Sequence, residues 1–427
     1  MNFVNGKIIS NEECDTVLEN IGEMLITTLQ KPLLDTNIVI NACDILVKNI
    51  SNLKVIKKLP EMGISPRLAE IYISQISHML SAEAIKKRLE IELSPPSEIV
   101  YLHSKARAYQ HTMPLGVLLH ITAGNVDVLP FVSLLEGLIC GNINIVKLPG
   151  EDQGITVMLL EELFEIAPSL KEYVYIFDYS SKDIVAMKRL AEVADAIVVW
   201  GGDEAVRAVR TLAHPNTRII EWGHKISFAY VTKASNSQLE DLALNICLTN
   251  QLFCSSCQGV FLDTNDMHDV YNFCQQFLPV LEKVSEENPF AFSEQEALFT
   301  SAKVTLELYN KQIESMASGT RVFKGKNCSI TANENSALEA SIMYRNIWVK
   351  PLKRENILTL RRYKNHLQTA ALICSKDDYG NLADKLHRAG IVKICDGLEM
   401  SNHAFGEAHD GVFTLRCYTK LSSLMSM

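Results

Sequence analysis

Hydrophobic residues recur at helical spacing through the first 93 residues, as in CDTVLENIGEMLITTLQ and SPRLAEIYISQISHML. Apolar side chains at intervals of three and four residues favour amphipathic helices, and few β-branched runs interrupt this period. From Gly116 onward, short β-branched runs alternate with helical patterns; these runs are GVLLHITAG, NINIVKLPG, YVYIFDY, DAIVVWGG and TRIIEWG. Alternating strands and helices predict a parallel sheet that is covered on both faces. We therefore expect a doubly wound α/β domain, which in other proteins commonly binds nucleotides at the carboxyl ends of its strands.

A second α/β pattern begins near residue 225. Its strand-like runs KISFAYVTK, GVFLD, TAALICS and GIVKIC are separated by a helical pattern near 237–253 and by longer ones over 267–320. Two further segments, 97–110 and 411–420, look extended. Because unpaired strand edges attract other strands, we expect a homodimer or tetramer in which the tail pairs with the ribbon of another subunit. The sequence thus predicts a helical part over 1–94, a doubly wound domain over 95–224 that includes the ribbon 97–110, a second α/β domain over 225–404, and an oligomerisation tail over 405–427.

Composition narrows the class of protein. The 427 residues are 47% hydrophobic, and 41 Lys and Arg against 50 Asp and Glu give a net charge of −9, with no basic run that would follow a nucleic acid backbone. The N-terminus lacks the charged and apolar regions of a signal peptide, which predicts a cytoplasmic protein. The most apolar window, VLPFVSLLEGLICGNINIV, is interrupted by Glu136 and two glycines, so no membrane span is expected. Eleven cysteines in such a chain suggest reduced thiols.

The stretch LTNQLFCSSCQGVFLD places Cys254 and Cys257 between a helical pattern and an expected strand. A zinc site needs about four ligands, usually as two closely spaced pairs, and no second pair is evident in the sequence. A dithiol redox motif begins a helix in a much smaller domain, whereas this pair follows a helix. A third interpretation is a single cysteine nucleophile. We expect no metal site, with a non-catalytic C-x-x-C metal-binding protein as the rival from another class.

The segment NQLFCSSCQG resembles the N-Q-x-x-C segment that carries the nucleophile of the aldehyde dehydrogenase superfamily, and the match gives that role to Cys254. Four further segments resemble the superfamily in the same order: ITAGNVDVLP, GNINIVKLPGED, VVWGGDEAVRAV and IIEWGHKISFAYV. Five segments in order over about 140 residues are specific, whereas each alone is weak. The long helical N-terminus and the wording HITAGN and CSSCQG look most like the LuxC-type acyl-CoA reductases, over roughly residues 95–420.

This resemblance implies an aldehyde dehydrogenase-like fold, in which the doubly wound domain holds a nicotinamide cofactor and the second α/β domain is catalytic. It implies that Asn125 helps to form the oxyanion hole, that Glu221 occupies the general base position and that Lys147 contacts the adenosine ribose. Further cofactor contacts are expected from Thr122, Ala123, Gly201 and Gly202.

Simpler interpretations of these residues stay open. Asn125 could end a strand, because asparagine tolerates turn conformations. Lys147 could be a solvated strand end, and Gly201 with Gly202 could form a plain tight turn. Glu221 could be the partner of an ion pair on the surface of the sheet.

The sequence departs from the superfamily in two places. The second carboxylate motif, E-E-x-F-G-P, should fall near SIMYRNIWVKP, where it is absent. After Lys147 the Pro-Ser-Glu of the family becomes Leu148-Pro149-Gly150-Glu151, so the acidic residue is replaced or displaced by one position. Losing a carboxylate there removes repulsion of a 2′-phosphate, which favours NADPH, with NADH possible.

The function implied is NAD(P)H-dependent reduction of an acyl thioester, from acyl-CoA or an acyl-protein and with a fatty acyl group, to an aldehyde through an acyl-enzyme on Cys254. The alternative in the same fold is an aldehyde dehydrogenase, in which Glu221 would activate the water that hydrolyses the acyl-enzyme.

Overall fold

The structure, a computed structural model, describes residues 1–58, 66–93, 97–101, 103–122, 128–150, 154–289, 294–316, 318–402 and 406–425. The chain divides into two compact units. The described residues of the first unit lie within Met1–Leu59, Ala69–Gly223 and Ala404–Met427, and those of the second lie mainly within His224–His403. In the described part of the chain, no helix is both long and apolar enough to cross a membrane.

The N-terminal part of the first unit contains the helices that the apolar spacing predicted. The α1 helix shows why it starts where it does: Ser10 Oγ accepts from the Glu13 N–H, and the Glu13 carboxylate accepts from the Ser10 N–H, which together satisfy two N–H groups at the helix start. The helices up to residue 223 are α1 Asn11–Leu29, α2 Thr36–Lys48, η1 Ile50–Asn52, α3 Lys54–Lys58, α4 Pro66–Leu80, α5 Ala82–Glu92, α6 Leu129–Ile139, α7 Ile155–Ile166, η2 Pro168–Tyr173, α8 Ile184–Glu192 and α9 Asp203–Leu212.

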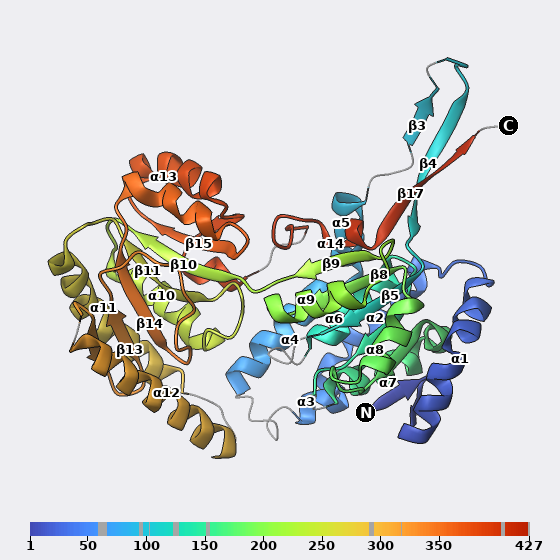
Figure 1. The fold of residues 1–427 in the computed structure, drawn as a ribbon, viewed down its shortest axis with the longest axis horizontal. Coiled ribbons are helices and arrows are strands. Elements are labelled where there is room, and N and C mark those ends of the chain that lie inside the picture. The colour runs from blue at the N-terminus through green and yellow to red at the C-terminus, as the bar shows by residue number, and fades with distance from the viewer. Residues whose placement is uncertain are drawn as a thin grey trace. The chain divides into compact units, whose positions relative to one another are not determined.

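The sheet of the first unit has the strand order β2-β1-β7-β6-β5-β8-β9 (Figure 1). Its strands are β1 Asn2–Val4, β2 Lys7–Ile9, β5 Val117–Ile121, β6 Ile143–Lys147, β7 Val174–Phe177, β8 Ala196–Trp200 and β9 Arg218–Trp222. From β7 to β9 all neighbours are parallel. Helices α1, α8 and α9 pack on one face, and α6 packs against β6 with α2 and α7 behind it. The expected doubly wound sheet is confirmed, but the short antiparallel strands β1 and β2 were missed.

The strand order reverses direction at β5. The chain runs from β5 through β6 to β7 on one side, and returns to the other side of β5 with β8 and β9. At such a switch point the loops that leave the two central strands diverge, and they open a crevice at the carboxyl ends of the strands. This topology places the ends of β5, β6 and β8 at the edge where a ligand is expected.

A buried polar network crosses this sheet. His120 is fully buried on β5, with Nδ1 2.7 Å from Ser133 Oγ and Nε2 3.0 Å from Asn144 Oδ1. Trp200 Nε1 donates to the same Ser133 Oγ at 3.0 Å. Burial lowers the pKa of His120 to about 4, so the ring is neutral at neutral pH.

His120 should make stability fall in mild acid. Its pKa is about 4 in the folded chain and about 6.5 when unfolded, so between these values protons bind preferentially to the unfolded chain. The contribution is complete above pH 6.5 and decreases as the pH falls towards 4, by about 2 kcal/mol from pH 7 to pH 5. Urea unfolding at several pH values should show that His120→Gln removes this part of the slope. The exposed His214→Gln should keep it, and equal slopes in both variants would contradict the assignment.

The second unit is another α/β layer structure, with the strand order β12-β13-β14-β11-β10-β15-β16 (Figure 1). All neighbours are parallel except the edge strand β12. The strands are β10 Ile226–Val231, β11 Cys257–Leu262, β12 Arg321–Lys324, β13 Ser329–Ala332, β14 Asn346–Pro351, β15 Leu367–Ile373 and β16 Lys393–Cys395. The helices are α10 Asn236–Thr249, α11 Met267–Glu287, α12 Glu294–Ser315, η3 Arg354–Tyr363, α13 Lys376–Ala389 and η4 Leu398–Ser401. Helices α10 and α11 bury one face of the sheet, and η3 and α13 bury the other.

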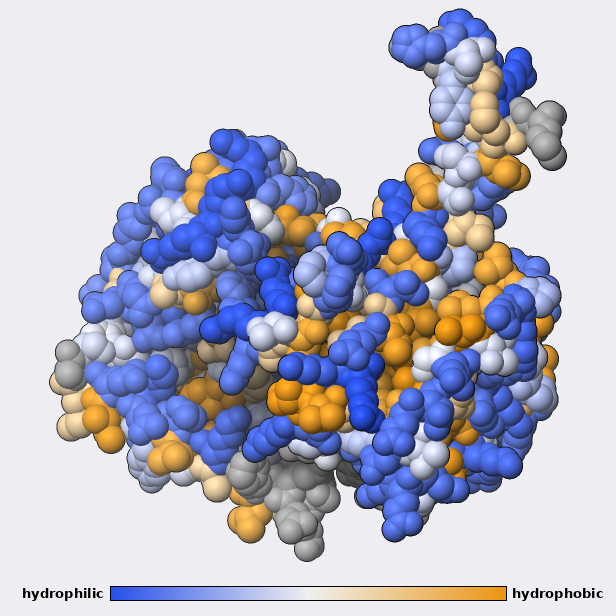
Figure 2. All heavy atoms as spheres, turned by 45° about the vertical axis from the view of Figure 1, so that its right-hand side comes forward, coloured by the Kyte–Doolittle hydropathy of each residue, from blue (hydrophilic) through white to orange (hydrophobic). Residues whose placement is uncertain are grey.

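A third, antiparallel sheet of order β17-β4-β3 projects from the first unit as a ribbon (Figures 1 and 2). It consists of β3 Ser97–Val100, β4 Arg107–Pro114 and β17 Thr419–Met425. The tail therefore pairs with β4 of its own chain, from Thr419 opposite Pro114 to Met425 opposite Ala108. We expected the tail to pair with the ribbon of another subunit. This expectation was wrong for the edge of β17 that faces β4. The strand also begins later than expected, because Thr414–Cys417 form the short helix α14.

Candidate functional site

The turn that holds Cys254 joins α10 to β11 in the second unit. Its first two residues, Asn250 and Gln251, have φ angles of 47° and 64°, which non-glycine residues adopt rarely. Backbone in this region is disfavoured by roughly 1–3 kcal/mol per residue and persists only where its surroundings impose it. Cys254 itself is partly exposed, while the turn around it is held.

Gln368 on β15 and Ser227 on β10 fix the position of Cys254. Gln368 Nε2 donates to Cys254 Sγ at 3.3 Å, and Gln368 is itself buried. Ser227 Oγ, on β10, donates to the Cys254 carbonyl at 2.7 Å and accepts from the Thr369 N–H at 3.1 Å. An N–H donor at this distance stabilises a thiolate more than a thiol, because the charged acceptor forms the stronger bond. No motif in the sequence pointed to Gln368, which lies 114 residues beyond Cys254.

Cys257 has a different environment. It is the first residue of β11 and fully buried, its N–H donates to Asn245 Oδ1 at 3.2 Å, and its Sγ donates to the Gly259 carbonyl at 3.3 Å. Burial raises the pKa of the Cys257 thiol to about 12. Both Cys254 and Cys257 are free thiols. Within the described residues, no group of three or more His, Cys, Asp or Glu side chains could hold a metal ion. Cys257 is therefore a core residue, and Cys254 is the thiol of this pair that a substrate can reach.

The segment where the second carboxylate motif was expected lies against the nucleophile turn. Gln251 Nε2 donates to the Cys257 carbonyl at 2.9 Å and to Ser341 Oγ at 3.0 Å, and Ser341 donates to Gln258 Oε1. The Tyr344 N–H donates to the Asn250 carbonyl at 3.0 Å. The chain thus presents a serine hydroxyl and amides beside the turn, in a segment whose sequence lacks the acidic motif.

The buried Arg345 side chain links the nucleophile turn to helix α11. Its side chain is 1% exposed, and Nε donates to Asn250 Oδ1 at 3.3 Å. The guanidinium also donates to the carbonyl and hydroxyl of Ser285 and to the Asn288 carbonyl. These contacts join the nucleophile turn to the end of α11. Burial lowers the pKa of Arg345, and several oxygen acceptors compensate for the lost hydration of its charge.

Two predicted cofactor residues lie together at the carboxyl edge of the first unit. Thr122 follows β5 and Lys147 ends β6, both are buried, and Thr122 Oγ1 donates to the Lys147 carbonyl at 3.3 Å. Burial lowers the pKa of Lys147, an effect that the charge of Asp178 opposes. A partly desolvated ammonium at a switch point is suited to an anionic or hydroxyl-rich ligand.

Gly201 and Gly202 form the turn from β8 into α9, at the same edge. The Gly201 N–H donates to the Trp222 carbonyl at 3.1 Å, and a Cβ on Gly201 would come within 3.0 Å of Ala205 Cβ. A side chain at 201 would therefore be tight against the first turn of α9, whereas the position of a Cβ on Gly202 is open. Asp203 and Glu204 already place negative charge at the helix start, so this N-terminus is a poor phosphate site.

Among the described residues with an expected role in the site, Glu221 fits its expected role least well. It lies on β9 and forms two hydrogen bonds with the Arg210 guanidinium, at 2.5 and 2.9 Å. Both carboxylate oxygens are therefore already engaged by the guanidinium. This geometry matches the ion-pair interpretation of Glu221. The role of Glu221 as a general base stays a prediction. Asn125, Ala123 and Glu151 lie outside the described residues.

Solved structures with the same fold are aldehyde dehydrogenases. A putative aldehyde dehydrogenase from Burkholderia cenocepacia has a TM-score of 0.75 at 15% identity, covering 100% of this chain and 97% of that one. The NADP-dependent glyceraldehyde-3-phosphate dehydrogenase from Bacillus halodurans C-125 has a TM-score of 0.73 at 15% identity, covering 100% and 98%. The expected aldehyde dehydrogenase-like fold is confirmed.

Comparison by sequence identifies the family more narrowly than the shared fold does. The chain is 22% identical to a long-chain acyl-protein thioester reductase of Aliivibrio fischeri over 370 residues, which cover 85% of this chain and 75% of the relative. It is 25% identical to long-chain acyl-protein thioester reductase 2 of Photobacterium leiognathi over 258 residues, or 57% of this chain and about half, 54%, of the relative. The family model of acyl-CoA reductase (LuxC) matches residues 33–421, and the chain belongs to that family.

Proposed function

We propose that the protein reduces a fatty acyl thioester to an aldehyde with a nicotinamide cofactor, through an acyl-enzyme on Cys254. The observation that carries this proposal is the accessible Cys254 thiol with the Gln368 amide 3.3 Å from its sulfur. The names of the two relatives as acyl-protein thioester reductases and of the family as acyl-CoA reductases support the choice of a thioester substrate.

The chemistry follows from the sulfur and its donors. The Cys254 thiolate bonds to the acyl carbon, and the thiol of the donor leaves as the carbonyl re-forms. The cofactor, when bound, supplies hydride to that carbon, and Thr122, Lys147 and Gly201 are the described residues that would hold it. The thiohemiacetal on Cys254 then loses aldehyde, and the Gln368 amide again stabilises the released thiolate.

Cofactor consumption and product analysis test this function. Purified protein with NADPH and acyl-CoAs of increasing chain length should oxidise NADPH and release the matching aldehyde in equal amounts. The pairing of Glu221 with Arg210 argues against an aldehyde dehydrogenase that uses Glu221 to activate water. If aldehyde with NADP⁺ gives free acid much faster than acyl-CoA gives aldehyde, the reductase proposal fails.

We expect NADPH to be used at least as well as NADH, because Leu148, Pro149 and Gly150, which follow Lys147 in the chain, carry no carboxylate where the superfamily has its acidic residue. Lys147→Ala should weaken binding of both cofactors, whereas the exposed Lys188→Ala should not. Fluorescence titration of the protein with each cofactor measures this. A preference for NADH of more than about tenfold, roughly 1.4 kcal/mol, would contradict the expectation.

Assembly through the ribbon is also part of the proposal. Apolar side chains on β17 are largely exposed, with Leu421 at 64% and Leu424 at 68%. A monomer rarely leaves such apolar side chains on an edge strand open to solvent, so we expect a homodimer or tetramer. Light scattering at micromolar concentration should show it, and the variant with Leu421→Glu and Leu424→Glu should dissociate. A fully active monomer would remove this part of the proposal.

A further inference from the structure

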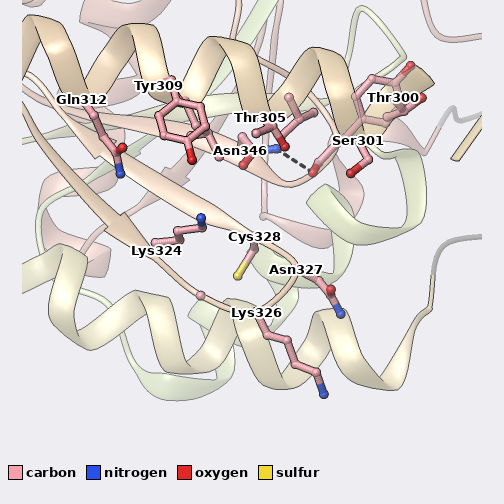
Figure 3. Close-up of a pocket in the computed structure, with 14 residues that line it drawn as sticks. Thr300, Ser301, Thr305, Tyr309, Gln312, Lys324, Lys326, Asn327, Cys328 and Asn346 are labelled. Carbon is pink, nitrogen blue, oxygen red and sulfur yellow. Dashed lines mark hydrogen bonds between the residues drawn. The ribbon is translucent and has the colours of Figure 1, made fainter. Parts of the chain in front are cut away.

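The second unit contains a pocket that the chemistry above does not use. It has a volume of about 430 Å³ and lies between α12 and the turn from β12 to β13, with Tyr344 and Asn346 also in its lining (Figure 3). This volume is within the range of roughly 300–1,000 Å³ that small-molecule sites occupy.

The lining of this pocket is polar and cationic as well as apolar. Helix α12 contributes the Thr305 hydroxyl, the Tyr309 phenol and the Gln312 amide, next to Val304 and Leu308. Such a surface offers hydrogen bonds to amides and hydroxyls in addition to apolar contact. A bare alkyl chain would contact the apolar side chains but would leave these polar groups without partners.

Lys324 gives the pocket its charge. Lys326 pairs with Glu286 at 3.0 Å and points away from the space, whereas the Lys324 side chain extends between Tyr309 and Cys328 (Figure 3). No carboxylate is present among the described residues that line the pocket. An ammonium in a pocket without carboxylates favours an anionic ligand.

The pocket and Cys254 share one edge of the sheet. Cys328 directly precedes β13, Asn346 begins β14, and the nucleophile turn directly precedes β11. These three strands are adjacent and parallel, so β13 and β11 are about 10 Å apart. Tyr344 connects the two places, since it lines the pocket while its N–H donates to the Asn250 carbonyl.

We propose that this pocket binds the phosphopantetheine arm of the acyl donor, with Lys324 contacting the phosphate and the thioester reaching Cys254. The inference rests on the proposed function and names the chemistry of its substrate. Between its sulfur and its phosphorus the arm has two amides and a hydroxyl, which match the pocket lining. An extended chain advances about 3.5 Å for every three bonds, so the arm is roughly 15 Å long from sulfur to phosphorus. This length is enough to reach from β13 to β11.

Substrates with and without the phosphate test the proposal. Lys324→Glu should raise KM for a fatty acyl-CoA by about tenfold or more, because it replaces an attractive charge contact with a repulsive one. KM for the same acyl group on N-acetylcysteamine, which lacks the phosphate and most of the arm, should stay within about twofold. Lys303→Glu makes the same charge change on an exposed part of α12 outside the pocket and should affect neither substrate. An equal effect of Lys324→Glu on both substrates, or none on acyl-CoA, overturns the proposal.

Direct binding separates this inference from the proposed function. Calorimetry with 4′-phosphopantetheine and with CoA should show binding to the Cys254→Ala protein that Lys324→Glu weakens. If such binding occurs and no thioester is reduced, the proposed function is wrong, whereas binding of the arm in the pocket is supported. If thioesters are reduced and neither probe binds, the pocket fails alone. Comparing acyl-CoA with an acylated carrier protein then identifies the source of the arm, since both should depend on Lys324 if both are donors.

Discussion

Cys254→Ala is expected to abolish both acylation and thioester reduction, by about three orders of magnitude or more, while cofactor binding stays nearly intact. The acyl-enzyme requires a thiolate, and alanine offers no atom that can bond to the acyl carbon. Incubation with acyl-CoA without cofactor, followed by mass spectrometry of the peptide that contains residues 250–258, should find the acyl group on Cys254.

Cys257→Ala is the matched control, three residues along the same segment. Its thiol is fully buried and its pKa is raised to about 12, so it contributes no thiolate at neutral pH. The variant should keep most of the activity and lose some stability, because it removes a buried sulfur from the core. Acylation on Cys257, or equal loss of activity in the two variants, would restore the paired-cysteine interpretation.

The parts of the fold that depend on local pattern could be predicted from the sequence. The β5, β6 and β8 strands are mostly apolar, β-branched runs because both faces of the sheet are covered, and such runs are visible without knowledge of their neighbours. The strands β1 and β2 were missed because each has only three residues, and their place beside β7 depends on a long-range pairing. The tail was misjudged for a related reason, since its partner strand could not be identified from its own alternation.

The candidate site also contains residues that the sequence could identify and residues that it could not. Cys254 and Lys147 lie in short motifs, so their residue types and neighbours were enough to single them out. Gln368, Ser341 and Arg345 reach the nucleophile turn from segments that are distant in the sequence, and no local pattern marks a glutamine that donates to a sulfur 114 residues away. Glu221 shows the converse, because a motif match cannot reveal that a nearby arginine already holds the carboxylate.

Gln368→Ala is expected to slow acylation of Cys254 at neutral pH by about 10- to 100-fold. The amide donates to the sulfur at 3.3 Å, and a hydrogen bond to a charged group contributes about 1.5–3 kcal/mol. Without the donor the thiolate is less stable, so more hydroxide is needed to form it. The rate of alkylation by iodoacetamide, measured from pH 6 to pH 10, should therefore shift to higher pH, and the acylation rate should recover partly in alkaline buffer.

A purely structural role for Gln368 would give a different profile, and Ser227→Ala provides the comparison. Ser227 Oγ donates to the Cys254 carbonyl at 2.7 Å and makes no contact with the sulfur that would stabilise charge, so its loss loosens the turn alone. This variant should be slower at every pH without a shift of the alkylation profile. Gln368→Glu should shift the profile further than alanine does, because a carboxylate beside the sulfur opposes a second negative charge. If Gln368→Ala lowers the rate equally at all pH values, the amide only positions Cys254 and does not stabilise its thiolate.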